Sequence, residues 1–258
     1  MLFTSAEIGA LIGSYFWPFI RIGAMVTAMP AFSSSFVPMR ARLMITIGIT
    51  IVIAPIIPAV PEVDMISMEA VFLVMYQILI GAAMGFIFHL VFAAFVIGGQ
   101  VIAMQMGLGF STMIDPMNGA STPVLAMFFV LMVTLFFLLM DGHLALITVV
   151  ADSFRTFPIE AKGISAATYW ELANWGSHMF IGAVLVCLPA VTALLLVNIS
   201  LGIMGRAAPQ LNIFAVGFSV TISSGFVILM ITLPVYLTQF ENLSLDAISV
   251  VKGIAKQP

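Results

Sequence analysis

Four ionisable side chains lie inside or between long apolar segments, where they could carry protons or ions across a membrane: Arg21, His89, Asp115 and Asp141. An arginine at the centre of a bilayer costs roughly 2.5 to 3.5 kcal/mol, so we expect Arg21 to face protein or water rather than lipid. Two arrangements are open. The guanidinium either snorkels or stacks on Trp17, one helical turn earlier, or it makes an ion contact with a neighbouring helix.

The other reactive residue types form no catalytic pattern. The three histidines are far apart in the sequence, and it contains no phosphate-binding loop, zinc-protease motif or nucleophile elbow. Asp141 and His143 point to different faces of a helix, so we expect a helix break there rather than a metal pair. Cys187 is the single cysteine, which excludes an internal disulfide. The sequence therefore predicts neither an enzyme nor a metal or cofactor site.

The composition is that of an integral membrane protein. Of the 258 residues, 62% are hydrophobic and only 7% are charged, against roughly 25% charged in soluble domains. There are 8 basic and 11 acidic residues, which give a net charge of −3, and they do not cluster. Neither a nucleic-acid partner nor a basic lipid-binding arm is therefore predicted.

Long apolar runs separated by polar, proline-containing links predict an all-α membrane protein. The run from residue 70 to about 106 would exceed a bilayer by about 20 Å as one straight helix, so it must tilt, kink or protrude. Within this run, Gly81 and Gly85 have the spacing that allows two helices to pack closely. The predicted helical runs are 8–32, 43–58, 70–106, 124–140, 144–151, 176–204 and 217–240.

The stretch from Gln105 to Pro123 separates two of the most apolar runs and is rich in residues that break helices. Its glycines tolerate positive φ, and a residue before proline disfavours the helical region, so we expect an irregular loop. At membrane depth such backbone survives only where protein buries it or where it lines a cavity. The loop is therefore predicted to lie inside an assembly, at a pore or gate.

Two functions of different classes fit these features. One is a non-enzymatic subunit that forms and closes a protein channel, and the other is a stand-alone proton-coupled or small-solute transporter that uses Arg21, Asp115 and Asp141. A transporter would show broken helices at corresponding positions of two repeats, and the two halves of this sequence have no matching interruption. Methionines around the loop either fill a core or form a deformable seal for a pore. They are Met104, Met106, Met113 and Met117.

Several short motifs occur in order along the chain. They are Pro38-x-Arg40-x-Arg42, the segment from Gln105 to Pro116, the pair Gly142-His143, and the segment 201–217, whose tip carries Arg206, Pro209, Gln210 and Asn212. Together they resemble the FliR family of flagellar type III export-gate membrane proteins and its injectisome relatives. The resemblance extends from Phe16 to about Phe240.

The resemblance implies a helical hetero-oligomeric export gate in the bacterial inner membrane, at the flagellar basal body. Long kinked helices and helical hairpins of one copy would join several FliP and FliQ subunits, with FlhA and FlhB as further partners. The exported substrates would be unfolded flagellar proteins, and membrane lipid would contact the gate. The loop 107–118 would be the plug that closes the channel. Its residues are Gly107, Gly109, Phe110, Met113, Asp115, Pro116 and Met117.

The resemblance also implies a division of the chain into parts. A helical part similar to FliP would be joined by a connecting segment to a hairpin similar to FliQ, with a tail after it. In the tail, Leu245, Ile248 and Val251 are spaced for a short amphipathic helix. The implied parts are 1–151, 152–175, 176–240 and 241–258.

Overall fold

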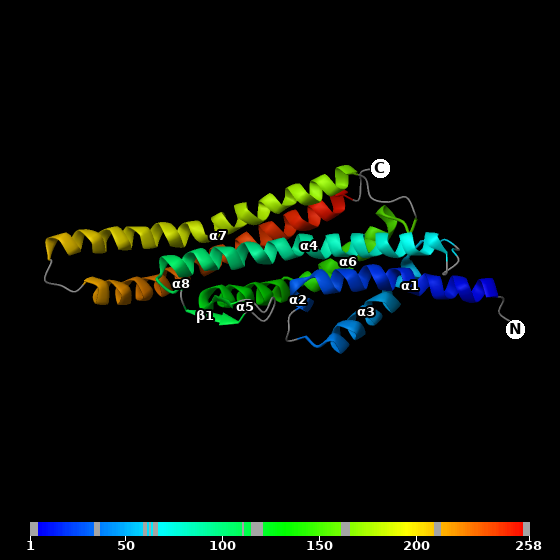
Figure 1. Cartoon of the computed structure of the whole chain (residues 1–258), viewed down its shortest axis with the longest axis horizontal. Coiled ribbons are helices and arrows are strands. Elements are labelled where there is room, and N and C mark those ends of the chain that lie inside the picture. Colours follow the sequence, from blue (N-terminus) through cyan, green and yellow to red (C-terminus); the bar gives the residue numbers. More distant parts are fainter. Residues whose placement is uncertain are drawn as a thin grey trace. The chain divides into compact units, whose positions relative to one another are not determined.

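The structure is a computed structural model that describes residues 5–33, 37–58, 61, 63, 67–109, 111–114, 121–160, 166–208 and 213–254. Nearly all of these residues are helical, which confirms the predicted all-α fold (Figure 1). The helices are α1 (Ser5–Ala28), α2 (Pro30–Ser33), α3 (Met39–Ile53), the 3₁₀ helix η1 (Ala54–Ile56), α4 (Met68–Gln105), α5 (Val124–Leu139), α6 (Gly142–Thr156), α7 (Ala166–Ala207) and α8 (Ile213–Ile254). Two short strands, β1 (Thr112–Ile114) and β2 (Ser121–Pro123), lie between α4 and α5.

Several of the described helices have the length and composition of membrane spans. Four of them are long and apolar enough to cross a membrane, or up to five if α5 and α6 together make one span. The longest predicted run is a single helix, α4, of 38 residues. At about 1.5 Å per residue it is roughly 57 Å long, against roughly 30 Å for the hydrocarbon core of a bilayer. The predicted membrane class is confirmed.

The chain packs as two units. Unit 1 consists of Met1–His89, Leu138–Gly176 and Asp246–Pro258, and unit 2 consists of Leu90–Phe137 and Ser177–Leu245. Four helices, α4, α5, α7 and α8, each contribute residues to both units.

In unit 1, α1 lies along the first half of α4 (Figure 1). A Cβ on Gly81 would overlap the carbonyl oxygen of Arg21, and a Cβ on Gly85 would lie 2.6 Å from Ala28 Cβ and 2.8 Å from the carbonyl oxygen of Met25. A residue without a side chain is needed where two backbones approach so closely. The predicted role of the two glycines in close helix packing is confirmed.

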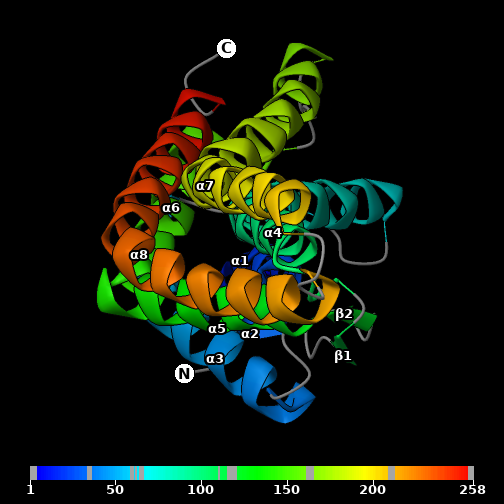
Figure 2. The same cartoon turned by 90° about the vertical axis from the view of Figure 1, so that its left-hand side faces the viewer.

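In unit 2, neighbouring glycines of α4 face two different helices. A Cβ on Gly98 would lie 2.8 Å from Val186 Cγ1 of α7, and one on Gly99 would lie 2.6 Å from Phe129 Cδ2 of α5. Figure 2 shows α5 next to α8, and the rings of Phe129 and Tyr236 join them at a centroid distance of 5.1 Å. Further ring contacts involve Phe92, Phe95, Phe136, Phe137 and Phe240.

The end of α8 corrects the predicted tail. Residues 241–254 are a continuation of α8 and not a separate short helix. Leu243, Ala247 and Val251 are buried, whereas Leu245 is 56% exposed. The helical prediction is right, and Val251 is buried as predicted, but Leu245 is not part of the buried face. Which face of residues 241–254 is buried is determined by the preceding part of α8, because the buried Tyr236 and Phe240 lie on the same face of the continuous helix.

Candidate functional site

The predicted functional loop begins where α4 ends, and this helix end is a Schellman motif. Gly107 has a φ of +80°, as the sequence predicts for a glycine that breaks a helix. The N–H of Leu108 donates to the carbonyl of Ala103 at 2.8 Å, and the N–H of Gly107 donates to that of Met104 at 3.1 Å. These bonds satisfy carbonyls that the end of the helix leaves free, so the chain leaves α4 in a defined direction.

The base of the loop is a paired hairpin, which corrects the prediction of an irregular loop there. Beyond the strands, the N–H of Val124 donates to the carbonyl of Ser111 at 2.9 Å and ties the first turn of α5 to the start of the loop. Strands of three residues are too short for alternation to be visible in the sequence. The antiparallel partners are Thr112 and Pro123, Met113 and Thr122, and Ile114 and Ser121.

The start of the loop is anchored on α8. Met106 is fully buried, and its side chain lies against Gly225, where an added Cβ would come within 2.5 Å of Met106 Cε. A Cβ on Gly107 would lie 3.3 Å from Phe218 Cε2. Of the two roles predicted for the loop methionines, core packing is therefore the one that fits Met106. Met104 is 62% exposed on the last turn of α4.

The remaining plug residues are placed as follows. A Cβ on Gly109 would lie 3.2 Å from Met104 Cγ, so this glycine follows the end of α4 closely. Met113 belongs to β1. The other predicted plug residues lie outside the described residues; they are Phe110, Asp115, Pro116 and Met117.

The predicted hairpin tip lies between α7 and α8. Arg206 is in the last turn of α7 and is exposed, where a cation interacts favourably with the negative end of the helix dipole. The other three predicted tip residues lie outside the described residues; they are Pro209, Gln210 and Asn212.

A polar site in unit 1 is formed around Arg21. Its side chain is fully buried, which confirms that it faces protein. Its Nε donates to Gln77 Oε1 of α4 at 2.7 Å, and one terminal nitrogen donates to the carbonyl of Phe157 at 2.9 Å. The other terminal nitrogen donates to the carbonyl and the hydroxyl of Ser153 at 3.0 and 3.2 Å. The guanidinium carbon lies 4.1 Å from the centre of the Phe154 ring.

Both predicted arrangements of Arg21 are wrong, because its aromatic neighbour is Phe154 rather than Trp17 and its partners in the described part of the chain are neutral. The charge is instead held at the C-terminal end of α6, where Phe157 is the C-cap and its N–H also donates to the Ser153 carbonyl. Free carbonyls and the negative end of the helix dipole favour a cation at this position. Arg21 therefore joins α1, α4 and α6.

Asp141 lies at the break between α5 and α6, as the sequence predicts. It has a φ of +53°, in the left-handed region that aspartate tolerates better than most residues, and its side chain is exposed. The N–H groups of Leu144 and Ala145 donate to its carbonyl at 2.9 and 3.1 Å, so its backbone begins α6. Arg21 and Asp141 are not hydrogen-bonded to each other, and Asp115, the third residue of the transporter hypothesis, lies outside the described residues.

Comparison with known proteins finds a match over most of the chain. The family described as bacterial export proteins, family 1, matches residues 12–247. The flagellar biosynthetic protein FliR of Pectobacterium carotovorum subsp. carotovorum is 36% identical, over 100% of this chain and 98% of its own. Its counterpart in Escherichia coli (strain K12) is 35% identical, over 98% and 97% of the two chains. That of Bacillus subtilis (strain 168) is 30% identical, over 90% of each.

Proposed function

This chain belongs to the bacterial export proteins, family 1, and is a component of the flagellar export apparatus, and from this premise we propose that it helps to form and to close the channel of the export gate. The substrates would be unfolded flagellar proteins. The alternative of a stand-alone transporter is not favoured by the family membership. In this proposal the chain is a structural and gating subunit and performs no catalysis.

The observation that carries the gating role is the way the loop is mounted. Its first residues are fixed by the Schellman motif and by the packing of Met106 on α8, and its two ends are held together by the paired strands. Six residues, 115–120, connect the two strands. A short segment on a rigid base can close a pore and still be displaced by a substrate, since its movement need not disturb the helices that carry it. We assign the plug to the loop 107–118 on this basis.

Assembly with other subunits is supported by the exposed surface of the hairpin made by α7 and α8. On α7, no charged residue lies between His178 and Arg206, and on α8 none precedes Glu241. Large apolar side chains are exposed along this stretch, and exposed apolar surface of this extent marks contact with lipid or with other proteins. They include Phe180, Val184, Leu188, Leu195, Ile199, Ile203, Phe226, Met230 and Ile231.

The partners follow from the resemblance to the FliR family. FliP and FliQ would form the core complex with this chain, FlhB and FlhA would join it, and membrane lipid would cover what remains. The chain is a membrane-embedded flagellar protein, and its membrane would be the bacterial inner membrane at the basal body. Within the chain, 1–151 would correspond to a FliP-like part and 176–240 to a FliQ-like hairpin, joined by 152–175 and followed by the tail 241–258.

Native mass spectrometry of a tagged copy, extracted from the membranes of its own cells, tests this proposal. We expect a discrete particle that holds one copy of this chain and several copies of two smaller membrane proteins. Expressed without partners, the chain should aggregate or be degraded, because its apolar helices would have no neighbours to cover them. A well-behaved monomer or homodimer with the same tag would contradict the proposal and favour the transporter.

A further inference from the structure

A pocket of about 250 Å³ lies in unit 1, lined by α4, α6, the first turns of α7 and the end of α8. Its floor is apolar and is formed by Ile80, Met84 and Ile87 of α4, Val149 of α6 and Val251 of α8. Pockets that enclose a whole drug-sized molecule measure roughly 300 to 1,000 Å³. The space beside α4 is smaller and therefore fits one chain-like apolar group.

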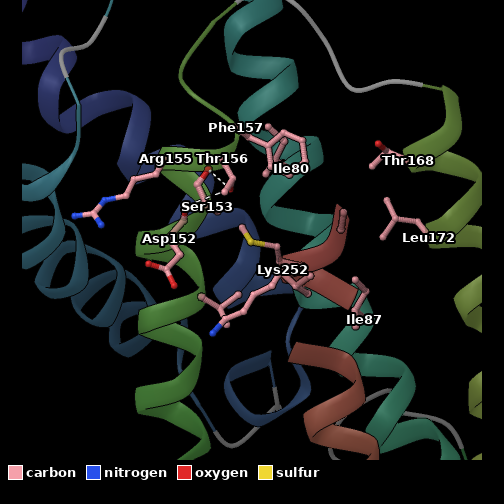
Figure 3. A pocket seen from close by; sticks show the side chains of 14 residues that line it. Ile80, Ile87, Asp152, Ser153, Arg155, Thr156, Phe157, Thr168, Leu172 and Lys252 are labelled. Atoms are coloured by element: carbon pink, nitrogen blue, oxygen red, sulfur yellow. Dashed lines mark hydrogen bonds between the residues drawn. The ribbon is translucent and has the colours of Figure 1, made fainter. Parts of the chain in front are cut away.

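Two charges of opposite sign stand on one side of this pocket. Figure 3 shows Asp152 on α6 and the side-chain end of Lys252 on α8 on the same side of the pocket, with Thr168 and Leu172 of α7 on the opposite side. Within the described residues, neither the Asp152 carboxylate nor the Lys252 ammonium takes part in an ion pair or a hydrogen bond. Two opposite charges at the edge of an apolar pocket are complementary to a ligand head that itself carries both signs.

The surroundings of the pocket indicate its depth in a membrane. Thr168, which lines it, is followed on α7 by Tyr169 and Trp170, which are 43% and 73% exposed. Exposed tyrosine and tryptophan side chains are enriched at the boundary between lipid headgroups and hydrocarbon. The floor belongs to α4, a helix long and apolar enough to cross a membrane. An occupant at this depth meets headgroups at the rim and acyl chains beyond it.

We propose that the pocket binds a membrane phospholipid with a primary ammonium headgroup, such as phosphatidylethanolamine. One acyl chain lies on the floor formed by Ile80, Met84 and Val251. The phosphate pairs with Lys252, and the ammonium donates hydrogen bonds to the carboxylate of Asp152. An anionic lipid would gain the contact with Lys252 but would meet the negative charge of Asp152, and a choline headgroup has no N–H to donate. The site holds independently of the role of the loop in gating.

Photo-crosslinking tests this assignment on the intact complex purified from membranes. The complex is reconstituted with phosphatidylethanolamine that carries a diazirine on one acyl chain, irradiated, and digested for peptide mass spectrometry. We expect label on segments 80–87 and 149–157. Ala83 also lines the pocket. Ala83→Trp should fill the space and remove this label, whereas Arg155→Gln should keep it, because Arg155 belongs to the same lining but points away from the other side chains (Figure 3).

Headgroup competition gives a second readout that does not depend on filling the pocket. Unlabelled phosphatidylethanolamine should compete better than phosphatidylglycerol. Asp152→Asn should reduce this preference by about two- to fivefold, the effect of one exposed ion pair. Lys252→Gln, on the exposed rim, should weaken both lipids alike, and it remains informative if Ala83→Trp prevents assembly.

Three results would overturn the assignment. The first is label found only outside the two segments. The second is equal competition by phosphatidylethanolamine and phosphatidylglycerol in the unaltered complex. The third is capture of a protein rather than a lipid by a photo-crosslinking amino acid at position 84, which would make the pocket a docking site for a partner subunit.

Discussion

The contact between α1 and α4 makes a quantitative prediction for the substitution Gly81→Ala. The added methyl group would overlap the carbonyl oxygen of Arg21 and would lie 2.9 Å from Ala24 Cβ and 3.0 Å from the carbonyl carbon of Arg21. Two of these three atoms belong to the backbone of α1, which cannot rotate away as a side chain can. The two helices must therefore separate, and the residue that moves first is Arg21, whose guanidinium holds the end of α6.

The expected cost follows from two opposing terms. Overpacking a tight contact costs about 1 to 3 kcal/mol, and a backbone contact belongs at the upper end of that range. Alanine stabilises a helix interior by about 1 kcal/mol relative to glycine. The net loss is therefore about 2 kcal/mol, or a factor of about 30 in the folding equilibrium. Gly48 of α3 is the matched control, since no atom lies within 4 Å of its added Cβ, so Gly48→Ala should gain about 1 kcal/mol.

The assay is the thermal midpoint of the purified complex. A change of 1 kcal/mol corresponds to about 2 to 4 °C at this chain length, so Gly81→Ala should lower the midpoint by about 4 to 8 °C and Gly48→Ala should raise it by about 2 to 4 °C. If Gly81→Ala is no less stable than Gly48→Ala, the close approach of α1 to α4 is wrong, and the position of Arg21 with it.

Three further substitutions test the other polar positions. Arg21→Lys keeps the charge but loses the planar guanidinium that reaches Gln77 and Phe157 together. It should therefore lower the thermal midpoint of the complex and cost about 2 kcal/mol or more. An unchanged midpoint would mean that the charge alone is enough to hold the end of α6. Arg206→Ala should reduce complex yield and swarming more than Lys256→Ala, and equal, negligible effects would leave the tip as an ordinary loop. Asp141→Gly should preserve motility because glycine adopts the φ of +53° freely, and a loss of motility with normal assembly would give the carboxylate a functional role.

Features that depend on nearby residues could be predicted from the sequence. The apolar runs define the long helices, and the four-residue spacing of Gly81 and Gly85 marks a close contact whichever helix provides the partner. The helix break at Asp141 follows from local chemistry too. The short motifs that led to the FliR family are also local, and the match over residues 12–247 agrees with them.

The partners of Arg21 were beyond sequence reasoning for a physical reason. They lie 56, 132 and 136 residues away, and two of the acceptors are backbone carbonyls, which every residue has. A carbonyl becomes a partner for a buried cation only where a helix ends. Helix α6 ends at residue 156, inside the segment 152–175, whose polar composition indicates a connecting link. The strand pairing at the base of the loop and the buried face at the end of α8 are also not predictable from the sequence, because both depend on packing rather than on local pattern.

The mounting of the loop gives the most direct test of its gating role. Residues 115–120 can be replaced by Asn-Gly, a two-residue turn that joins Ile114 to Ser121 and keeps the paired strands. A six-residue Gly-Ser segment of the original length is the matched control, and it separates the effect of length from that of the side chains.

The measurement is the ion conductance of the assembled gate in a planar bilayer before any substrate is added. We expect the Asn-Gly variant to conduct while the unaltered gate stays closed, with the complex assembled to the same yield. A conductance equal to that of the unaltered gate would contradict this expectation and would remove the plug from this chain.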